Sequence, residues 1–374
     1  MGLTSRSFLA LAPLMLGGVC SPTLMGGDPR LNEIKLPEGF RIEVYAENVP
    51  SARAMCWGDK GTLFVGSRDE GAVYAVRDTN NDHKADAVIT IARDLKMPVG
   101  VAFRNGDLYV SAVSSILRLR AIEDHLDAPP APEVVTAGFP TETHHGWKFI
   151  AFGPDGRLYV PVGAPCNICL SEDSIFASIT RIDVDNPGVP EIVAHGVRNT
   201  VGFDWDPRDS SLWFTDNGRD WLGDDSPDCE LNHAVRPGQH FGYPFCHAGE
   251  VSDPEFGKGH ACSDYAGPAA KLGAHVAPLG MRFLRNKGFP EAYHGAILIA
   301  EHGSWNRSVP SGYRLVLAHP RPDGTASTEV FAEGWLSGSK AWGRPADVLE
   351  MADGSVLVSD DAADLIYRIT YHPR

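Results

Sequence analysis

The chain has 374 residues, 43% hydrophobic and 22% charged, which is the composition of an ordinary globular protein. Its net charge of −15, from 33 basic and 48 acidic side chains, argues against a nucleic-acid partner and is compatible with neutral or cationic ligands. The 39 glycines and 28 prolines favour short strands joined by turns over long helices.

The first 27 residues have the features of a secretory signal peptide. Arg6 supplies a positive charge, and the apolar run FLALAPLMLGGV at residues 8–19 is too short to cross a membrane as a helix. We therefore expect a periplasmic or secreted protein without a transmembrane segment, in which residues 28–374 form a single domain. A lipoprotein anchor at Cys20 is the less favoured alternative, because a valine precedes it where lipid attachment needs a small residue.

A turn containing Gly or Asp, followed by a short apolar strand, recurs six times. The copies are KGTLFVGS, NGDLYVSA, DGRLYVPV, DSSLWFTD, HGAILIAE and DGSVLVSD, which begin at residues 60, 105, 155, 209, 294 and 353. Intervals of roughly 45 to 60 residues, one of them lengthened by an insertion, match the period of a β-propeller blade. We therefore predict an all-β fold, a six-bladed β-propeller that residues 39–47 close by joining the last blade. A pair of β-sandwiches is the alternative, but it leaves the repeat unexplained.

Two adjacent histidines, His144 and His145, precede the third copy of the repeat. A histidine near the mouth of a propeller channel could act as a general base, because its ordinary pKa lies near neutral pH. Capping of a strand is the structural alternative, and for a histidine pair taken alone it is the more frequent one.

Two further segments carry groups that suit a planar anion. In HGVRNTVG, from residue 195, Arg198 and Asn199 place a guanidinium beside an amide. A salt bridge between blades is the structural alternative. Arg344 in GRPADV, with His302 and Arg307 in AEHGSWNR, adds cationic groups near strand ends.

The segment TDNGRDWLGDDSPDCELN, residues 215–232, is dense in carboxylates and exposed main-chain carbonyls. Hard oxygen ligands at this density suit Ca²⁺, although acidic loops are also commonly just solvated. A second acidic segment, DTNNDHKAD at residues 78–86, departs from an EF-hand loop at the sixth and twelfth positions. We predict a hairpin turn there.

Six cysteines follow the signal segment: Cys56, Cys166, Cys169, Cys229, Cys246 and Cys262. An even number in an exported protein indicates disulfides. Cys166 and Cys169 form CNIC, which we predict to be a local disulfide, and Cys246 with Cys262 is a reasonable second pair. CNIC is not a covalent haem site, because Leu170 follows it, and a zinc site would need a second close pair.

Taken together, these segments resemble the soluble quinoprotein glucose/sorbosone dehydrogenase family. The resemblance extends from LPEGF at residue 36 to YRI at residue 367. It rests on HHGWKFIAFGPDGRLY, HGVRNTVG, the TDNG to ELN loop, PGQHFGYPFC behind that loop, and GRPADV. It implies a propeller that binds pyrroloquinoline quinone (PQQ) and Ca²⁺ and oxidises an aldose or aldehyde sugar at C1. CNIC and GAHVAPLGMRF look more like the sorbosone-type branch.

The resemblance also implies roles for individual residues. His145 corresponds to the catalytic general base, and His144 stands where the family often has an aspartate that orients it. Arg198 and Asn199 correspond to the pair beside the reactive quinone carbonyl. We expect Arg198 to be a catalytic residue and Asn199 to bind the cofactor. Arg344 corresponds to an arginine that pairs with a carboxylate of the cofactor.

The resemblance further implies two groups of metal ligands. Gly218 and Arg219 correspond to positions whose main-chain carbonyls hold the catalytic Ca²⁺. Asn217 and Glu230 fall near the structural calcium pair of the family.

Two cationic positions of the family pattern are altered, because Ala346 replaces an arginine and His302 replaces a lysine. The cofactor carries three carboxylates, so we expect His302, His275 or Arg307 to compensate for the lost charge.

Two other functions fit part of the pattern: a calcium-dependent, lactonase-like hydrolase, and a non-catalytic propeller that binds a carbohydrate or a protein. The pair of Arg198 and Asn199, together with Arg344, favours the quinoprotein, because a lactonase has no planar anionic cofactor to hold. The expected partners are a small sugar substrate and a soluble or membrane electron acceptor.

Overall fold

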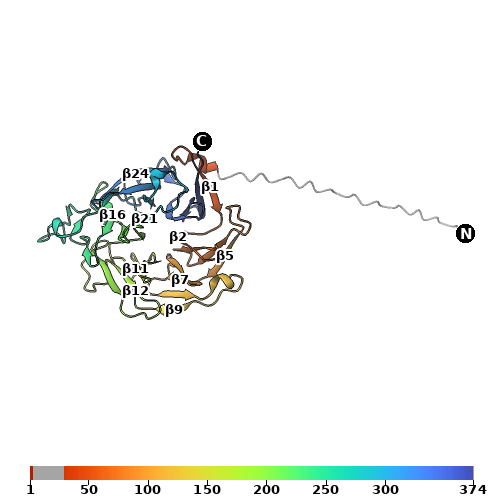
Figure 1. The fold of residues 1–374 in the computed structure, drawn as a ribbon, viewed down its shortest axis with the longest axis horizontal. Helices are drawn as coiled ribbons and strands as arrows, with labels where there is room; N and C mark the ends of the chain where they lie inside the picture. The colour runs from red at the N-terminus through yellow and green to blue at the C-terminus, as the bar shows by residue number, and fades with distance from the viewer. Residues whose placement is uncertain (3–28, 374) are drawn as a thin grey trace.

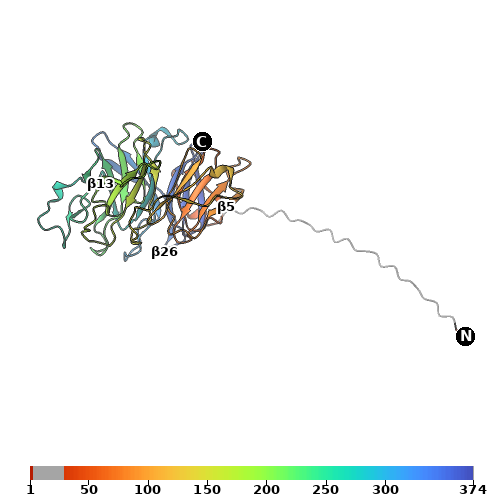
Figure 2. The same cartoon turned by 90° about the horizontal axis from the view of Figure 1, so that it is seen from below.

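The computed structural model describes residues 1–2 and 29–373 (Figures 1 and 2). The predicted signal peptide, apart from its first two residues, and Cys20 therefore lie outside the described residues. Within the described part of the chain, none of the helices has the length and hydropathy that a membrane span needs.

Six antiparallel sheets stand in a ring, so the predicted six-bladed β-propeller is confirmed (Figure 1). Blade 1 contains β2 (Ala52–Trp57), β3 (Leu63–Ser67), β4 (Val73–Arg77) and β5 (Ala87–Ala92). Blade 2 contains β6 (Val101–Arg104), β7 (Asp107–Ser111), β8 (Ile116–Leu119) and β9 (Glu133–Thr136). Blade 3 contains β10 (Ala151–Phe152), β11 (Leu158–Val162), β12 (Ser178–Ile182) and β13 (Glu191–His195). Blade 4 contains β14 (Phe203–Trp205), β15 (Leu212–Asp216), β16 (Asp228–Ala234) and β20 (Ala270–Ala274). Blade 5 contains β21 (Pro278–Phe283), β22 (Ile297–Glu301), β23 (Arg314–Pro320) and β24 (Ala326–Glu333). Blade 6 contains β27 (Pro345–Glu350), β28 (Val356–Asp360), β29 (Leu365–Tyr371) and β1 (Phe40–Ala46).

The sequence repeat forms the second strand of every blade, namely β3, β7, β11, β15, β22 and β28. Nearly all residues of these strands are buried, on both faces of the sheet. Each blade is packed between two neighbours, which explains why the repeat is a continuous apolar run and not an alternating pattern.

The hydrophobic core is divided into six main clusters, one between each pair of neighbouring blades. Blades 5 and 6, for example, share Leu298, Val358 and the fully buried Trp335. A small seventh cluster joins Val201, Leu279 and Ala346. The position at which an arginine was expected is therefore an apolar contact, with Ala346 only 3% exposed.

The ring is closed by β1, which pairs antiparallel with β29 from Phe40 opposite Tyr371 to Ala46 opposite Ile366. The first strand of the chain thus completes the last blade, as predicted for residues 39–47. The outermost strand of the last blade therefore comes from the opposite end of the described propeller, and its pairing with β29 holds the ring together.

The longest interruption of the repeat lies between β16 and β20, and its teal segment extends beyond the ring (Figure 1). It contains β17 (Gln239–His240), which adds to blade 3, the hairpin of β18 (Cys246–His247) and β19 (Val251–Ser252), and the 3₁₀ helix η3 (Cys262–Asp264). Other short elements are η1 (Pro29–Glu33), η2 (Ile122–Asp124), η4 (Glu291–Tyr293), β25 (Leu336–Ser337) and β26 (Lys340–Ala341).

Both predicted disulfides are present. Cys166 is bonded to Cys169, and Cys246 is bonded to Cys262 across the hairpin. Cys56 and Cys229 are free thiols.

Candidate functional site

A cavity of about 310 Å³ opens where the blades converge, and its lining residues are spread along the chain from Arg53 to Arg344. Because paired strands are antiparallel, the first residues of the inner strands and the residues that follow the second strands lie on the same face. Ala52 of β2, for example, is paired with Ser67 at the end of β3. This face collects the polar groups, while the strands behind it are buried.

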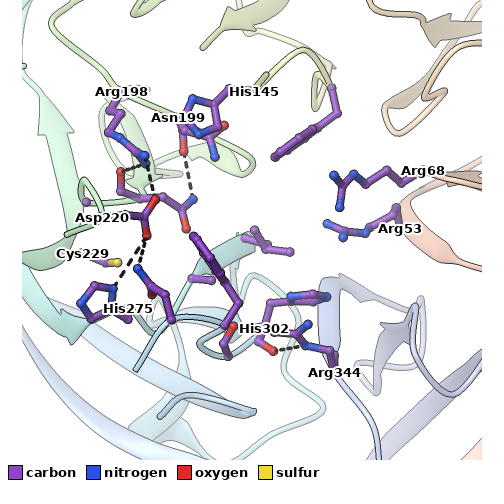
Figure 3. A pocket seen from close by; sticks show the side chains of 18 residues that line it. Arg53, Arg68, His145, Arg198, Asn199, Asp220, Cys229, His275, His302 and Arg344 are labelled. Atoms are coloured by element: carbon purple, nitrogen blue, oxygen red, sulfur yellow. Dashed lines mark hydrogen bonds and ion pairs between the residues drawn. The ribbon is translucent and has the colours of Figure 1, made fainter. Parts of the chain in front are cut away.

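Most residues that the sequence singled out for cofactor or catalytic roles line this cavity. They are His145, Arg198, Asn199, Asn217, Gly218, His275, His302 and Arg344 (Figure 3). Arg307, Arg219 and Glu230 are not among the lining residues. Arg307 donates instead to the main-chain oxygen of Asp224 at 2.9 Å and to the carboxylate of Asp225 at 2.6 Å.

The ring of His145 is fixed in one orientation. Its Nδ1 lies 2.9 Å from the carbonyl oxygen of Ala164, so Nδ1 carries the proton and Nε2 keeps the lone pair. The backbone at His145 is left-handed, with φ at 50°, and a Cβ on Gly163 would lie 2.5 Å from the His145 Cβ. Gly163 therefore leaves the space that this histidine occupies.

The pKa of His145 lies well below the ordinary value of 6.5. Burial is the main cause, and the positive charge of Arg198 adds to it. At neutral pH His145 is thus the neutral imidazole, which is the form that can accept a proton. His144 is exposed, and its ring contacts that of His145 edge to face, with centroids 4.2 Å apart and an interplanar angle of 63°.

Arg198 is buried and held on several sides. Its guanidinium donates to both oxygens of Asn167, at 2.9 and 2.8 Å. It also donates to the main-chain oxygen of Asn217 at 3.1 Å and to the carboxylate of Asp220 at 3.2 Å. Asp220 accepts a further bond from Asn306 at 2.8 Å. This network fixes the guanidinium on one wall of the cavity.

The opposite wall carries two arginines that the sequence analysis did not identify, Arg53 and Arg68 (Figure 3). Arg53 is 5% exposed and forms an ion pair with Asp361 at 2.6 Å, and Arg68 lies over the ring of Trp147 at 4.3 Å. The buried Nε atoms of both arginines have no hydrogen-bond partner among the described residues. The Arg68 Nε lies 3.7 Å from the Asp69 carboxylate, which is beyond hydrogen-bond distance. Buried donors without a hydrogen bond beside an open cavity are suited to an anionic ligand.

Arg344 and His302 form the third side. Arg344 donates to the main-chain oxygens of His302 and Gly303, at 3.1 and 2.7 Å. His302 bonds to the carboxylate of Asp361 at 2.7 Å, and burial lowers the pKa of His302 to about 4. His302 is therefore neutral at pH 7, so the additional positive charge comes from Arg53 and Arg68.

Three of the predicted metal ligands meet at one small cavity. Asn217 and Gly218 lie on the wall of the main cavity, together with Asp220. Behind this wall, Asn217 and Gly218 also line a cavity of about 10 Å³, together with Asp216 and Glu230. Over residues 1–2 and 29–373, no group of three or more His, Cys, Asp or Glu side chains is arranged to hold a metal ion.

Asp216 and Glu230 face one another across β15 and β16. Burial raises the pKa of Asp216 to about 6. Burial and the nearby Asp216 charge raise the pKa of Glu230 to about 8. Two buried carboxylates in contact disfavour one another's charge, and a cation between them would remove that penalty.

Two lining or neighbouring groups have structural roles. Burial raises the pKa of the Cys229 thiol to about 12, so this residue is not a reactive nucleophile at neutral pH. Arg219 forms a buried ion pair with Asp253 at 2.5 Å, and Asp253 also bonds to His247 at 2.9 Å. Arg219 thereby ties the acidic loop to the hairpin of β18 and β19.

Comparison with known proteins gives a family and several related structures. The family model described as TrAA12-like matches residues 34–370. An uncharacterized protein of Borreliella burgdorferi is 32% identical over 356 residues, which cover 90% of this chain and 91% of that protein. The sequence relationship thus extends over nearly the whole described propeller.

Three solved structures share the fold at low sequence identity. An iodide structure of a Trichoderma reesei enzyme of carbohydrate-active family AA12 has a TM-score of 0.79 at 19% identity, covering 90% of this chain and 97% of that one. The holo PQQ domain of a pyranose dehydrogenase from Coprinopsis cinerea has a TM-score of 0.75 at 18% identity, with the same coverage. The apo soluble aldose sugar dehydrogenase of Escherichia coli has a TM-score of 0.68 at 17% identity, covering 90% and 100%. The resemblance that the sequence indicated is confirmed.

Proposed function

Because the chain belongs to the TrAA12-like family, we propose that it is a sugar oxidoreductase that uses PQQ and Ca²⁺ to oxidise an aldose or aldehyde sugar at C1. The observation that carries this proposal is the composition of one cavity, in which four arginines surround the neutral histidine His145. Holo and calcium structures among the proteins of similar fold support the choice of cofactor and metal.

The cavity residues fit a planar, carboxylate-bearing cofactor. The buried Nε atoms of Arg53 and Arg68 have no hydrogen-bond partner among the described residues, and such donors suit a carboxylate ligand. Arg344 adds a third guanidinium, and Arg198 with Asn199 adds a donor pair on the facing wall. Arg53 and Arg198 are paired with the carboxylates of Asp361 and Asp220, whereas the Arg344 guanidinium donates to main-chain oxygens and keeps its charge for an anionic ligand.

The oxygen donors fit calcium in a more limited way. Asn217, Gly218 and Asp220 present amide, main-chain and carboxylate oxygens on one wall, and oxygen atoms are the ligands that Ca²⁺ prefers. These residues would hold the catalytic ion. Glu230 and Asp216 would hold a structural ion, because burial raises the pKa of both carboxyls and the Asp216 charge further raises that of Glu230.

The chain's own contribution to the reaction is a proton transfer and the positioning of the reactants. His145 Nε2 takes the proton of the C1 hydroxyl while C1 loses a hydride, and Nδ1 stays bonded to Ala164. When bound, PQQ would supply the hydride acceptor and Ca²⁺ would supply Lewis-acid activation. Arg198, fixed by Asn167, holds its positive charge beside the reacting centre without having to reorganise.

The function is tested by reconstitution. Purified full-length chain is incubated with PQQ and Ca²⁺, and dye reduction is followed with a panel of aldoses and sorbosone. We expect a visible-range cofactor spectrum and reduction of the dye by at least one sugar. Lactone hydrolysis in the absence of both signals would instead establish a hydrolase and contradict the proposal.

The pH dependence of turnover should reflect the lowered pKa of His145. A base acts in its neutral form, and a pKa well below 6.5 keeps that form populated as the pH falls through 6.5. We therefore expect kcat/KM to stay level from pH 8 to below 6.5 and to decline only at lower pH. A decline centred at 6.5 or above in a kcat/KM profile would contradict this assignment.

Calcium should stabilise the fold through the carboxylate pair of Asp216 and Glu230. A ligand that binds only the folded state at 100 times its Kd contributes about 2.7 kcal/mol, so Ca²⁺ should raise the Tm of chelator-treated protein. Glu230→Gln should lose this rise, because one of the two negative charges is removed. The measurement is calorimetry with and without Ca²⁺, and an undiminished rise in the variant would exclude Glu230 as a ligand.

A further inference from the structure

Two tryptophans, Trp221 and Trp305, are each 68% exposed, although tryptophan is usually well buried. Their rings stand edge to face, with centroids 5.5 Å apart and an interplanar angle of 88°. Over residues 29–373, they are the only aromatic side chains among the exposed large hydrophobic residues. Such a pair of apolar faces on a soluble protein calls for a functional explanation.

The two loops that carry these rings are held together by polar contacts. Asn306, next to Trp305, donates to the Asp220 carboxylate at 2.8 Å. Arg307 bonds to Asp224 and Asp225 on the other loop. Trp221 has a positive φ of 71°, a conformation that is uncommon for a bulky residue. The rings are therefore presented on a fixed support.

The tryptophan pair lies at the edge of the candidate active site. Trp305 lines the cavity itself, and Trp221 directly follows the lining residue Asp220. The cavity, at about 310 Å³, lies at the lower end of the range for small-molecule sites, which is roughly 300–1,000 Å³. A cofactor and one sugar ring would fill it, so any further sugar unit would have to lie outside, against the tryptophans.

We propose that Trp221 and Trp305 form an outer subsite for a second sugar ring, and that the substrate class is therefore oligosaccharides or saccharide chain ends. This inference rests on the proposed function, because oxidation at C1 places the reducing-end ring in the cavity. The remaining units then extend outward from the other hydroxyls of that ring. Flat C–H faces of a pyranose pack on indole rings, and the adjacent carboxylates of Asp224 and Asp225 accept bonds from sugar hydroxyls.

Binding without turnover provides the first test. Saturation-transfer NMR is recorded on the full chain with glucose, maltotriose and cellotriose, in the absence of PQQ. We expect the non-reducing rings of at least one trisaccharide to receive saturation, and Trp221→Ala to remove this signal. Trp221→Phe should retain much of it, and Val309→Ala is the matched control, since Val309 is an exposed apolar residue of the Trp305 loop.

Kinetics of the reconstituted protein provide the second test. We expect kcat/KM for one of the trisaccharides to exceed that for glucose, and Trp221→Ala to lower the ratio of the two on the order of tenfold. An unchanged ratio in Trp221→Ala, or equal effects of Trp221→Ala and Val309→Ala, overturns the subsite. So does a loss confined to the KM of a protein electron acceptor, which would make the tryptophans a docking surface.

The two proposals fail in different ways. If dye reduction occurs with monosaccharides but neither trisaccharide binds better, the oxidoreductase remains and the outer subsite is wrong. If no sugar of any length reduces the dye, the proposed function itself is wrong, whatever the NMR experiment shows.

Discussion

Replacing His145 with asparagine should lower kcat by about 10²- to 10⁴-fold, the usual contribution of a general base, while PQQ still binds. The choice of asparagine follows from the structure. Its Nδ2 can take the place of the histidine Nδ1 that bonds to Ala164, and asparagine tolerates the left-handed backbone at this position. Only the proton-accepting Nε2 is then lost.

His144→Asn is the matched control, because His144 is the exposed neighbour of the same residue type. The measurements are steady-state kcat and a PQQ titration followed by absorbance. Loss of PQQ binding in His145→Asn would assign His145 to the cofactor site and not to proton transfer. Equal losses of kcat in the two variants would contradict the choice of His145 over its neighbour.

Arg68→Met should weaken PQQ binding roughly 10- to 150-fold, since hydrogen bonds to charged groups contribute about 1.5–3 kcal/mol. Arg68 lines the cavity and its buried Nε has no hydrogen-bond partner among the described residues, whereas Arg307 is engaged with Asp224 and Asp225 outside it. Arg307→Met should therefore weaken PQQ binding much less. The two arginines give a direct contrast between the structure and the expectation from sequence.

The readout is the Kd of PQQ for the metal-loaded protein, measured by fluorescence quenching and independent of turnover. The melting temperature of each variant is measured in parallel, because the ring of Trp147 loses its cationic neighbour in Arg68→Met. If Arg307→Met is the more damaging change, the charge compensation lies where the sequence analysis placed it.

The fold could be predicted because the sequence contains one repeat for each blade. Each copy forms the same strand of its blade, and burial on both faces makes that strand apolar throughout. The closing strand was predictable for a related reason, since a ring of sheets has no stable open edge. Neither inference needs knowledge of side-chain contacts between distant segments.

Arg68 was missed, although the repeat contained a usable signal. Arg68 directly follows the first copy, as Asn217 follows the fourth and His302 the fifth, and all three line the cavity. The residue after a copy thus lines the site in three of the six blades, whereas Val113, Gly163 and Asp361, which follow the other copies, are not among the lining residues. An alignment of the copies with one another would have identified Arg68.

Arg53 supplies in the first blade the positive charge that the family pattern led us to expect at residue 346 in the last blade. Arg53 is the second residue of β2, and Ala346 is the second residue of β27. The two positions are equivalent, because the first residue of β2 pairs with the last residue of β3, and the first residue of β27 pairs with the last residue of β28. The charge absent at Ala346 is present at the equivalent position of the neighbouring blade. Only the assembled ring shows that the two positions are adjacent.

The state of His302 could not be read from the sequence at all. Its neutral form depends on burial, which outweighs the opposite effect of the carboxylate of Asp361, 59 residues further along the chain. Local patterns identify which residue types are present, but they do not determine desolvation, which here decides the charge.

The closure of the ring by β1 and β29 also determines when the site can exist. Arg53 and Arg68 belong to the first blade, whereas Arg344 and Asp361 belong to the last, and the ion pair of Arg53 with Asp361 spans the seam between them. Nearly the whole chain must be synthesised before these groups meet. A ligand that contacts both blades would stabilise the seam, because it binds only the closed ring. We therefore expect the cofactor to bind after the ring has folded and to increase the stability of the closed ring.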